Sequence, residues 1–536
     1  MRVFRPVWSA RVPLLAVLCA VILPATAGAQ QPAPTAVPSG PLTLEQVLDM
    51  AAGRSEGIGI AEAGVRRAQG DQTRARSGLF PQLTLSAGYD RALASEFSDI
   101  FRNVGNPAPG TGDAAEADLS QLPFGRANTW RLSLAFSQNL YTGGRISLQR
   151  KLAELGGESA GQNLTTARAQ LYYDATQAYY DAALADRLVA IAEATVQQAS
   201  DTLQQVQVGF DAGTQPEFEV LRARVNRDNQ QPVLIRQRMN RDLAILRLKQ
   251  MLDVPPEVDI RLADALGDER LAPPQVFATR VTAVEQSLVD TGRATLSSLN
   301  AGIPQPDRMV VAAAATAVTQ SETSLKLAEA ARKPSVSLTS TYTRLAYPAD
   351  DAFPRFDRTN WTVGVGLQVP ILTGGRQRGD ELVARADVDT ARLRLQQTKE
   401  LAAVDTQSSW AELLAARAAW EASGGTVQQA NRAYEIADVR YRNGVSTQLE
   451  LTDARLLLQQ AEANRAIAAR DLQVARARVA LLPDLPLGGT AAAAAARTPQ
   501  AAPQTTPSAP SQQQPSATGQ FTTASAAGAQ GQTGTR

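Results

Sequence analysis

A duplication organises most of the chain and limits the folds available to it. The sequence Thr-Gly-Gly-Arg occurs at residues 142–145 and again at residues 373–376, a spacing of 231 residues. Three more pairs of identical residues keep the same spacing: Trp130 and Trp361, Gly213 and Gly444, and Arg224 and Arg455. A constant spacing over so long a stretch indicates two copies of one structural unit, aligned without insertions over these positions.

The first copy carries an enlarged loop upstream of this region. The sequence that begins at Pro81 matches the one that begins at Pro334 with a spacing of 253 residues instead of 231. Copy one therefore has 22 additional residues between Tyr89 and Trp130, within a stretch rich in Gly, Pro, Asp and Ala. That composition is typical of loops, so we expect an enlarged loop between two strands.

Each copy contains two segments in which apolar residues alternate with small or polar ones. They lie at residues 83–89, 129–137, 336–342 and 361–369. This period of two predicts two β-hairpins, with strands of about ten residues that can cross a bilayer when tilted. Four strands cannot close a membrane barrel, so a barrel must be shared between subunits. The edge of a soluble sandwich is the weaker alternative, because four strands cannot bury the apolar faces of both copies.

Each Thr-Gly-Gly-Arg sequence is followed by a segment with the pattern of a very long helix. Proline is absent from residues 146–215 and from residues 371–482. From Leu171 to Val206, mostly small apolar residues recur at alternating spacings of four and three, and residues 402–437 repeat this heptad spacing. Small residues let helix axes approach closely. At 1.5 Å per residue, the first helix should extend about 95 Å.

A turn should end each long helix and fold the chain back as a helical hairpin. Gly213 and Gly444 favour the end of a helix. The pattern of a capping box, a threonine followed three residues later by a glutamate, begins at Thr214 and at Thr447 and should start the returning helices. Pro232 should kink the returning helix of copy one.

Composition excludes several classes of enzyme. The chain has no histidine, which removes Ser-His-Asp triads, Cys-His pairs and imidazole general bases. Its single cysteine, Cys19, lies in an apolar N-terminal segment, so thiolate metal sites and disulfides are not expected. The 53 basic residues balance 52 acidic ones, without a basic patch for nucleic acid. We therefore expect no enzyme, no cofactor and no metal site.

The two ends of the chain have the composition of segments outside a folded core. Arg2, Arg5 and Arg11 flank an apolar run at residues 12–23, and a small-x-small sequence precedes Gln30, which is the pattern of a cleaved signal peptide; the run is too short for a membrane anchor. The C-terminal residues are rich in Ala, Gln, Thr, Ser, Pro and Gly and should be disordered. We expect this organisation: signal peptide 1–29, linker 30–41, copy one 42–253, linker 254–280, copy two 281–484 and disordered tail 485–536.

Residues 42–484 resemble the TolC family of outer-membrane efflux channels. The resemblance rests on LTLEQVLDMA from Leu42, LFPQLTLS from Leu79, the NLYTGGR and PILTGGR sequences, and two Gly-x5-acid-x4-Arg motifs. It implies a homotrimer with a 12-stranded transmembrane β-barrel, surrounded by outer-membrane lipid and continued by a periplasmic α-helical barrel. In a Gram-negative bacterium, such a tunnel exports small molecules or proteins together with a periplasmic adaptor and an inner-membrane pump or secretion ATPase. The strand count predicted from the sequence agrees, because three chains with four strands each supply 12 strands.

The resemblance assigns an aperture to the turn of copy two. Its two acids one turn apart match Glu450 and Asp453, so that three subunits would form a ring of six carboxylates that attracts cations. Tyr441 and Arg442 would tether the closed tip to a neighbouring helix. Alternatively, Glu450 only completes a helix cap and Asp453 belongs to a solvated helix face.

The resemblance also assigns docking and membrane-interface residues. The tips that meet the adaptor comprise Gly213, Thr214, Glu219, Gly444, Ser446 and Thr447. Trp130 and Trp361 should mark an aromatic girdle at the barrel interface. Two rival functions are weaker: a periplasmic coiled-coil adaptor has no need of the alternating strands, and a carboxylate hydrolase needs a concave site that alanine seams do not supply.

Overall fold

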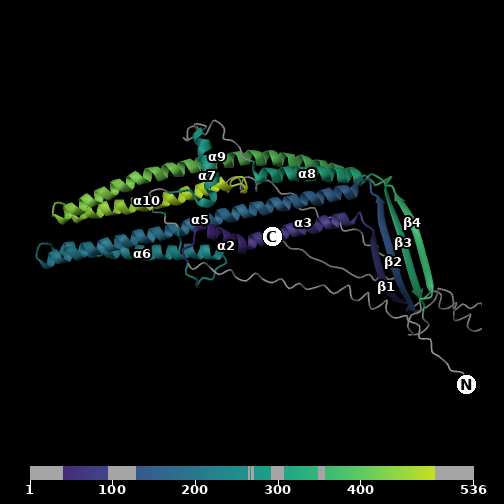
Figure 1. The fold of residues 1–536 in the computed structure, drawn as a ribbon, viewed down its shortest axis with the longest axis horizontal. Coiled ribbons are helices and arrows are strands. Elements are labelled where there is room, and N and C mark those ends of the chain that lie inside the picture. The colour runs from purple at the N-terminus through teal and green to yellow at the C-terminus, as the bar shows by residue number, and fades with distance from the viewer. Residues whose placement is uncertain are drawn as a thin grey trace, which may run out of the picture.

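The computed structural model describes residues 40–93, 128–263, 266, 271–290, 307–347 and 356–488. The expected signal peptide, most of the enlarged loop and nearly all of the expected C-terminal tail lie outside these residues. Within them, a four-stranded sheet occupies one end of an elongated molecule and the turns of two helical hairpins occupy the other (Figure 1).

The described elements follow the same order in both copies, which confirms the twofold repeat. Helices α3 and α8 have 22 residues each, and the long helices α5 and α9 have 67 residues each. Copy one contains α3 (Glu56–Ser77), β1 (Gln82–Arg91), β2 (Asn128–Tyr141), α5 (Arg145–Asp211) and α6 (Glu217–Met251). Copy two contains α8 (Met309–Ala330), β3 (Ser335–Ala346), β4 (Arg358–Gln368), α9 (Arg376–Arg442) and α10 (Gln448–Leu481). Outside this common order, the described residues contain three shorter helices: α2 (Leu44–Arg54), the 3-10 helix η2 (Gln275–Phe277) and α7 (Ala278–Asp290).

The four strands form one antiparallel sheet in the order β1-β2-β3-β4. The two predicted hairpins are β1–β2, in which Leu85 lies opposite Leu134, and β3–β4. Pairing of β2 with β3, with Leu134 opposite Tyr342, joins the hairpins. Strands β1 and β4 are the edges of this sheet, and they expose large apolar side chains such as Leu83 and Val365. Open edges of this kind are templates for pairing with another chain.

A pair of glycines leads the chain from the sheet into each long helix. Gly143 and Gly144 have φ angles of +63° and +89°, and Gly374 and Gly375 have φ angles of +57° and +87°. Residues with a Cβ atom are strained in this left-handed region. At Gly143, a Cβ atom would also lie 2.4 Å from the Cβ of Lys333. The repeated glycine pair is therefore required by the sharp entry into α5 and α9.

The long helices pack along the predicted heptad seam. Because α6 packs on α5, α5 on α10 and α10 on α9, the helices of the two hairpins lie in the order α6, α5, α10, α9. Every seam position from Leu171 to Val206, and every matching position from Ala402 to Ala437, is buried or partly buried. The heptad prediction is confirmed. Helix α6 continues through Pro232 to Met251.

The largest hydrophobic core lies midway along the molecule, where α2 and α7 lie against the long helices (Figure 1). Tyr179 of α5 is fully buried there, and its hydroxyl donates a hydrogen bond to the carbonyl oxygen of Leu42 (3.1 Å). Leu42 also forms a parallel β-bridge with Leu262. Phe277 and Val281 are buried in the same core. The segment between the two copies therefore packs against the middle of the helices.

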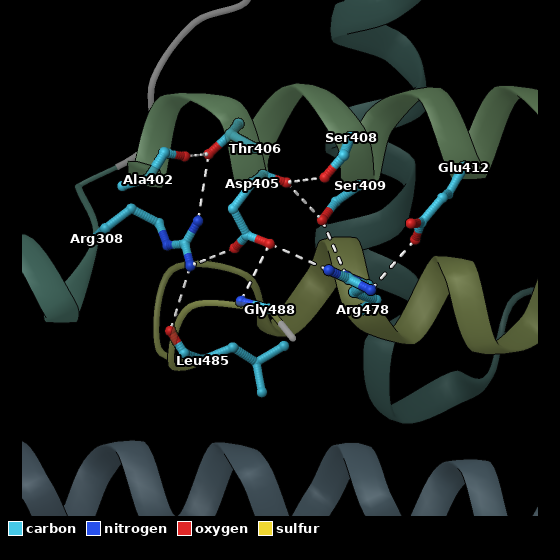
Figure 2. Close-up of polar contacts among 10 residues, drawn as sticks. All are labelled: Arg308, Ala402, Asp405, Thr406, Ser408, Ser409, Glu412, Arg478, Leu485 and Gly488. Carbon is cyan, nitrogen blue, oxygen red and sulfur yellow. Dashed lines mark hydrogen bonds and ion pairs between the residues drawn. The ribbon is translucent and has the colours of Figure 1, made fainter. Parts of the chain in front are cut away.

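A buried cluster of charged residues fixes the chain after α10 against α9 and the start of α8 (Figure 2). The carboxylate of Asp405 accepts hydrogen bonds from Arg308 (2.9 Å), from Arg478 (3.1 Å) and from the backbone N–H of Gly488 (3.2 Å). Arg308 also donates to the carbonyl oxygen of Leu485 (3.3 Å). The side chains of Arg308 and Asp405 are only 1% and 4% exposed. The chain is therefore held in place as far as Gly488.

Candidate functional site

The turns of the two helical hairpins lie at the end of the molecule farthest from the sheet (Figure 1). Each long helix ends two residues before a left-handed glycine, Gly213 (φ +75°) or Gly444 (φ +68°). The N–H groups of these glycines donate to the carbonyl oxygens of Phe210 (2.8 Å) and Tyr441 (2.9 Å). The glycines therefore end the helices as predicted, and both turns are exposed.

The returning helices begin differently in the two copies. In copy two, Thr447 is the N-cap of α10, and its hydroxyl accepts a hydrogen bond from the N–H of Glu450 (3.4 Å). In copy one, the capping box predicted at Thr214 is wrong. Pro216 is the N-cap of α6, and the Thr214 hydroxyl donates to the carbonyl oxygen of Gly209 (2.9 Å). A residue that precedes proline avoids the helical region, so α6 begins only after Pro216.

The two predicted aperture acids lie on one side of α10. Glu450 is in the first turn of the helix, Asp453 follows three residues later, and both are exposed. Side chains three residues apart on a helix are neighbours. Among the described residues, neither carboxylate has a hydrogen-bond or ion-pair partner. Both are therefore available to cations or to another chain.

Tyr441 connects the tips of the two copies. It packs against a small buried cluster that includes Val206 of α5 and Val220 of α6. Burial raises the pKa of the Tyr441 hydroxyl, the nearby negative charge of Glu219 raises it further, and Arg222 lowers it. One carboxylate oxygen of Glu219 is buried and has no hydrogen-bond partner among the described residues. The phenol and this carboxylate therefore lie in one partly desolvated region between α9 and α6.

In the single chain, Arg442 forms an ion pair with a residue of its own helix, α9. Its guanidinium lies 2.9 Å from the carboxylate of Asp438, one turn earlier on α9, and the Arg442 side chain remains exposed. Of the predicted docking residues, Gly213, Thr214, Gly444 and Thr447 are exposed, whereas Glu219 and Ser446 are partly buried. The turns thus present an exposed surface, whereas the side chains of Glu219 and Ser446 are partly covered by the neighbouring helices.

Buried polar side chains beside the turn of copy two were not predicted. Gln448 is buried, and neither polar atom of its side chain has a partner among the described residues; the same holds for the Ser446 hydroxyl. Arg455 is buried against α5, where it donates to the hydroxyl of Thr202 (2.9 Å). The repeated Gly-x5-acid-x4-Arg motif includes Arg455, but it does not predict that this residue is buried. The equivalent Arg224 is exposed, because α6 is an outermost helix among those described.

Trp130 and Trp361 lie in the sheet, far from the turns. The ring of Trp130 packs against Tyr89, with 4.8 Å between the ring centres. Trp361 is 69% exposed, and its indole N–H donates to the Ser340 hydroxyl (3.0 Å). Both tryptophans are near the first residues of their strands, away from the long helices, so they belong to the opposite end of the molecule from the predicted aperture.

The described residues contain no group of carboxylate or cysteine side chains arranged to hold a metal ion. None of the helices in the described ranges is both long enough and apolar enough to span a membrane.

The comparisons with known proteins agree with this architecture. A family model for outer membrane efflux proteins matches residues 47–253 and 307–483, one range in each copy. The structure of the Campylobacter jejuni CmeC outer membrane channel is similar, with a TM-score of 0.63, 16% identity, and coverage of 85% of this chain and 88% of that one. No match was found among curated protein sequences.

Two further solved structures show the same fold. The outer membrane protein VceC from Vibrio cholerae has a TM-score of 0.61 and 18% identity, over 82% of this chain and 96% of that one. The open state of the Neisseria gonorrhoeae MtrE outer membrane channel has a TM-score of 0.60 and 19% identity, over 84% of this chain and 94% of that one. The predicted fold is confirmed. Because the family model covers well over half of the sequence, the chain belongs to the outer membrane efflux protein family, and it is an efflux channel of the outer membrane that extends into the periplasm, not an enzyme.

Proposed function

We propose that three copies of this chain close a 12-stranded barrel in the outer membrane and that their helices form one tunnel into the periplasm. The observation that carries this proposal is the sheet of the single chain. Among the described residues, no strand pairs with the outer sides of its edge strands β1 and β4, and both strands expose apolar side chains. Four strands are too few to enclose a barrel, whereas three such sheets supply 12.

The outermost helices support the same assembly. Helix α6 exposes an apolar stripe on the side away from α5, with the spacing of one helix face and interrupted at Asp228 and Pro232; it is composed of Phe218, Leu221, Val225, Ile235, Met239, Leu243 and Leu246. Helix α9, at the other side of the chain, exposes Val404, Ile436 and Val439. Apolar stripes with this spacing bury themselves against another helix. We infer that α6 of one subunit packs on α9 of the next.

The hairpin turns are the proposed aperture and docking surface. With three subunits around one axis, Glu450 and Asp453 supply six carboxylates at the end of the tunnel, a ring that attracts cations and repels anions. Tyr441 and Arg442 lie within one turn of Gly444, and in this proposal they tether the closed tip to a neighbouring helix. The exposed turns around Gly213 and Gly444 are the surface for a periplasmic adaptor, which links the tunnel to an inner-membrane pump or secretion ATPase.

A charge placed in the α6 stripe tests the assembly. Met239→Glu should lose trimers, because it puts a carboxylate where an apolar side chain is buried between subunits, at a cost of about 2 kcal/mol or more for each interface. The control is Asn240→Glu, which adds the same charge to an exposed position beside the stripe. Native mass spectrometry of detergent-solubilised protein counts the subunits. Monomeric parent protein, or equally stable trimers from both variants, would contradict the proposal.

A further inference from the structure

The duplication places different residues at one equivalent position, immediately before α3 and α8. Ser55 is the N-cap of α3, and Arg308 is the N-cap of α8. In copy two, the guanidinium of Arg308 is buried against Asp405 (Figure 2). The residue equivalent to Asp405 in copy one is Asp174, at the spacing of 231 residues. At these two positions, copy one therefore keeps the carboxylate and has a serine in place of the arginine.

A cavity lies where copy two has this side chain. Its volume is about 540 Å³, and its lining from α3, α5 and α6 includes Ser55, Glu56, Asp174, Asp181 and Arg247. Among the described residues, the Asp174 carboxylate accepts its hydrogen bond from the neutral amide of Gln170, on the same helix (2.8 Å). Burial raises the pKa of Asp174, and the hydrogen bond from Gln170 lowers it by less. Arg54, next to Ser55, donates to the carbonyl oxygen of Leu252 (3.4 Å).

The equivalent cluster in copy two is balanced in charge. Its two acids, Asp405 and Glu412, are paired with two arginines. Arg308 contacts Asp405, and Arg478 contacts both Asp405 (3.1 Å) and Glu412 (3.3 Å). Two guanidinium groups therefore neutralise two carboxylates in the same place where copy one has its cavity.

The lining of the cavity in copy one carries more acidic than basic side chains. Asp181, which is equivalent to Glu412, pairs with Arg470 of α10 (2.7 Å). Arg247, equivalent to Arg478, is the basic residue in the lining, while Glu56 adds a third acid beside Asp174. Among the lining residues, three carboxylates thus accompany one guanidinium group, and Asp181 is paired from outside the lining by Arg470, which Asp471 shares (2.9 Å). Among the described residues, Asp174 has no ion pair equivalent to the one that Arg308 forms with Asp405 in copy two.

We propose that this cavity binds a guanidinium or primary ammonium group, which Asp174 holds as Asp405 holds Arg308. A half-buried carboxylate whose partner is a neutral amide gains strongly from a charge-assisted hydrogen bond. The cation is either a dissolved molecule that enters the cavity or a basic side chain of the neighbouring subunit, and the second source rests on the trimer proposed above. Both sources present the same chemistry to Asp174.

Calorimetric titration of the purified trimer with agmatine, which carries both cationic groups, tests the site. We expect one agmatine for each subunit and no binding of the uncharged analogue butylurea. Asp174→Asn should weaken agmatine binding about tenfold, because it keeps the shape of the side chain and removes its charge. Ser55→Arg should abolish binding, because it restores the side chain that fills this place in copy two.

A matched control lies on the same helix. Asp201 is exposed and accepts a hydrogen bond from Gln197, four residues earlier (2.9 Å), as Asp174 does from Gln170, but it lies outside the cavity. Asp201→Asn should therefore bind agmatine like the parent. If the parent binds no agmatine and Asp174→Asn alone lowers the melting temperature of the trimer, the cation is a side chain of the neighbouring subunit. Equal binding by the parent and Asp174→Asn overturns the proposal, as does absence of binding with no such loss of melting temperature.

Discussion

Arg308 and Asp405, which are 97 residues apart in the sequence, form an ion pair of 2.9 Å in which both side chains are almost completely buried. Loss of one partner from a buried pair leaves the other charge without compensation, at a cost of about 3–5 kcal/mol. Asp405→Asn should destabilise the subunit by about this amount. Arg308→Met should cost less, because Arg478 still neutralises Asp405. Apparent melting temperatures of the solubilised protein give the order, and a larger loss for Arg308→Met would contradict it.

The point at which the chain can be shortened follows from the same cluster. A chain that ends at Gly488 keeps both backbone contacts, whereas a chain that ends at Pro483 loses the Leu485 carbonyl and the Gly488 N–H from their charged partners. Hydrogen bonds to charged groups contribute about 1.5–3 kcal/mol each. The longer chain should give the same yield of heat-resistant trimers as the parent, and the shorter one should give a lower yield. Equal yields in outer-membrane fractions would show that these contacts are dispensable.

The stability of the folded tip should decrease at alkaline pH as the Tyr441 phenol loses its proton. Because its pKa is raised, the neutral phenol is the favoured form in the folded tip. Its contribution to stability is present below the ordinary pKa of tyrosine and is lost as the pH rises through the raised value. Glu219→Gln should lower the pKa of Tyr441, since it removes a negative charge beside the phenol. Absorbance titration of the phenolate, referenced to Tyr441→Phe, measures this change.

The control for that titration is Glu217→Gln, which neutralises an exposed acid in the first turn of the same helix. It should leave the pKa of Tyr441 near that of the parent. An equal decrease in both variants would mean that the pKa responds to the overall charge of the tip and not to the charge of Glu219 in particular.

The aperture proposal is tested by neutralising its acids. Glu450→Gln with Asp453→Asn should reduce the preference for cations several-fold and change the single-channel conductance in planar bilayers, because six charges leave the ring. The control is Asp211→Asn with Glu217→Gln, which removes two exposed acids from the turn region of copy one. If both double variants conduct like the parent, Glu450 and Asp453 serve only as helix cap and solvated surface.

Local signals in the sequence were enough to predict the long helices. The heptad seam from Leu171 to Val206, the absence of proline and the glycine at 213 predicted α5 to within about two residues at either end. These signals arise within a few residues of the chain or along one helix face. They can therefore be interpreted without knowing which distant segments pack against the helix. The period-two segments predicted all four strands for the same reason.

Contacts between distant segments could not be predicted in this way. Arg224 and Arg455 occupy the same place in the repeated motif, yet only Arg455 is buried, because α10 lies between two helices and α6 lies at the edge of the chain. Ser55 and Arg308 both precede a 22-residue helix, but the guanidinium finds its carboxylate only in the folded molecule. The threonine at 214 failed as a cap because Pro216, two residues later, delayed the helix.

The equal lengths of α5 and α9 restrict how such a channel can change in evolution. One residue inserted into either helix alone would shift its turn by about 1.5 Å along the axis and rotate it by about 100°. The inserted copy would then present a different side chain at its tip and lose register with the seam of the other hairpin. Changes in tunnel length are therefore tolerated only as matched steps in both copies, close to whole heptads, and a gene that lengthens one half must lengthen the other.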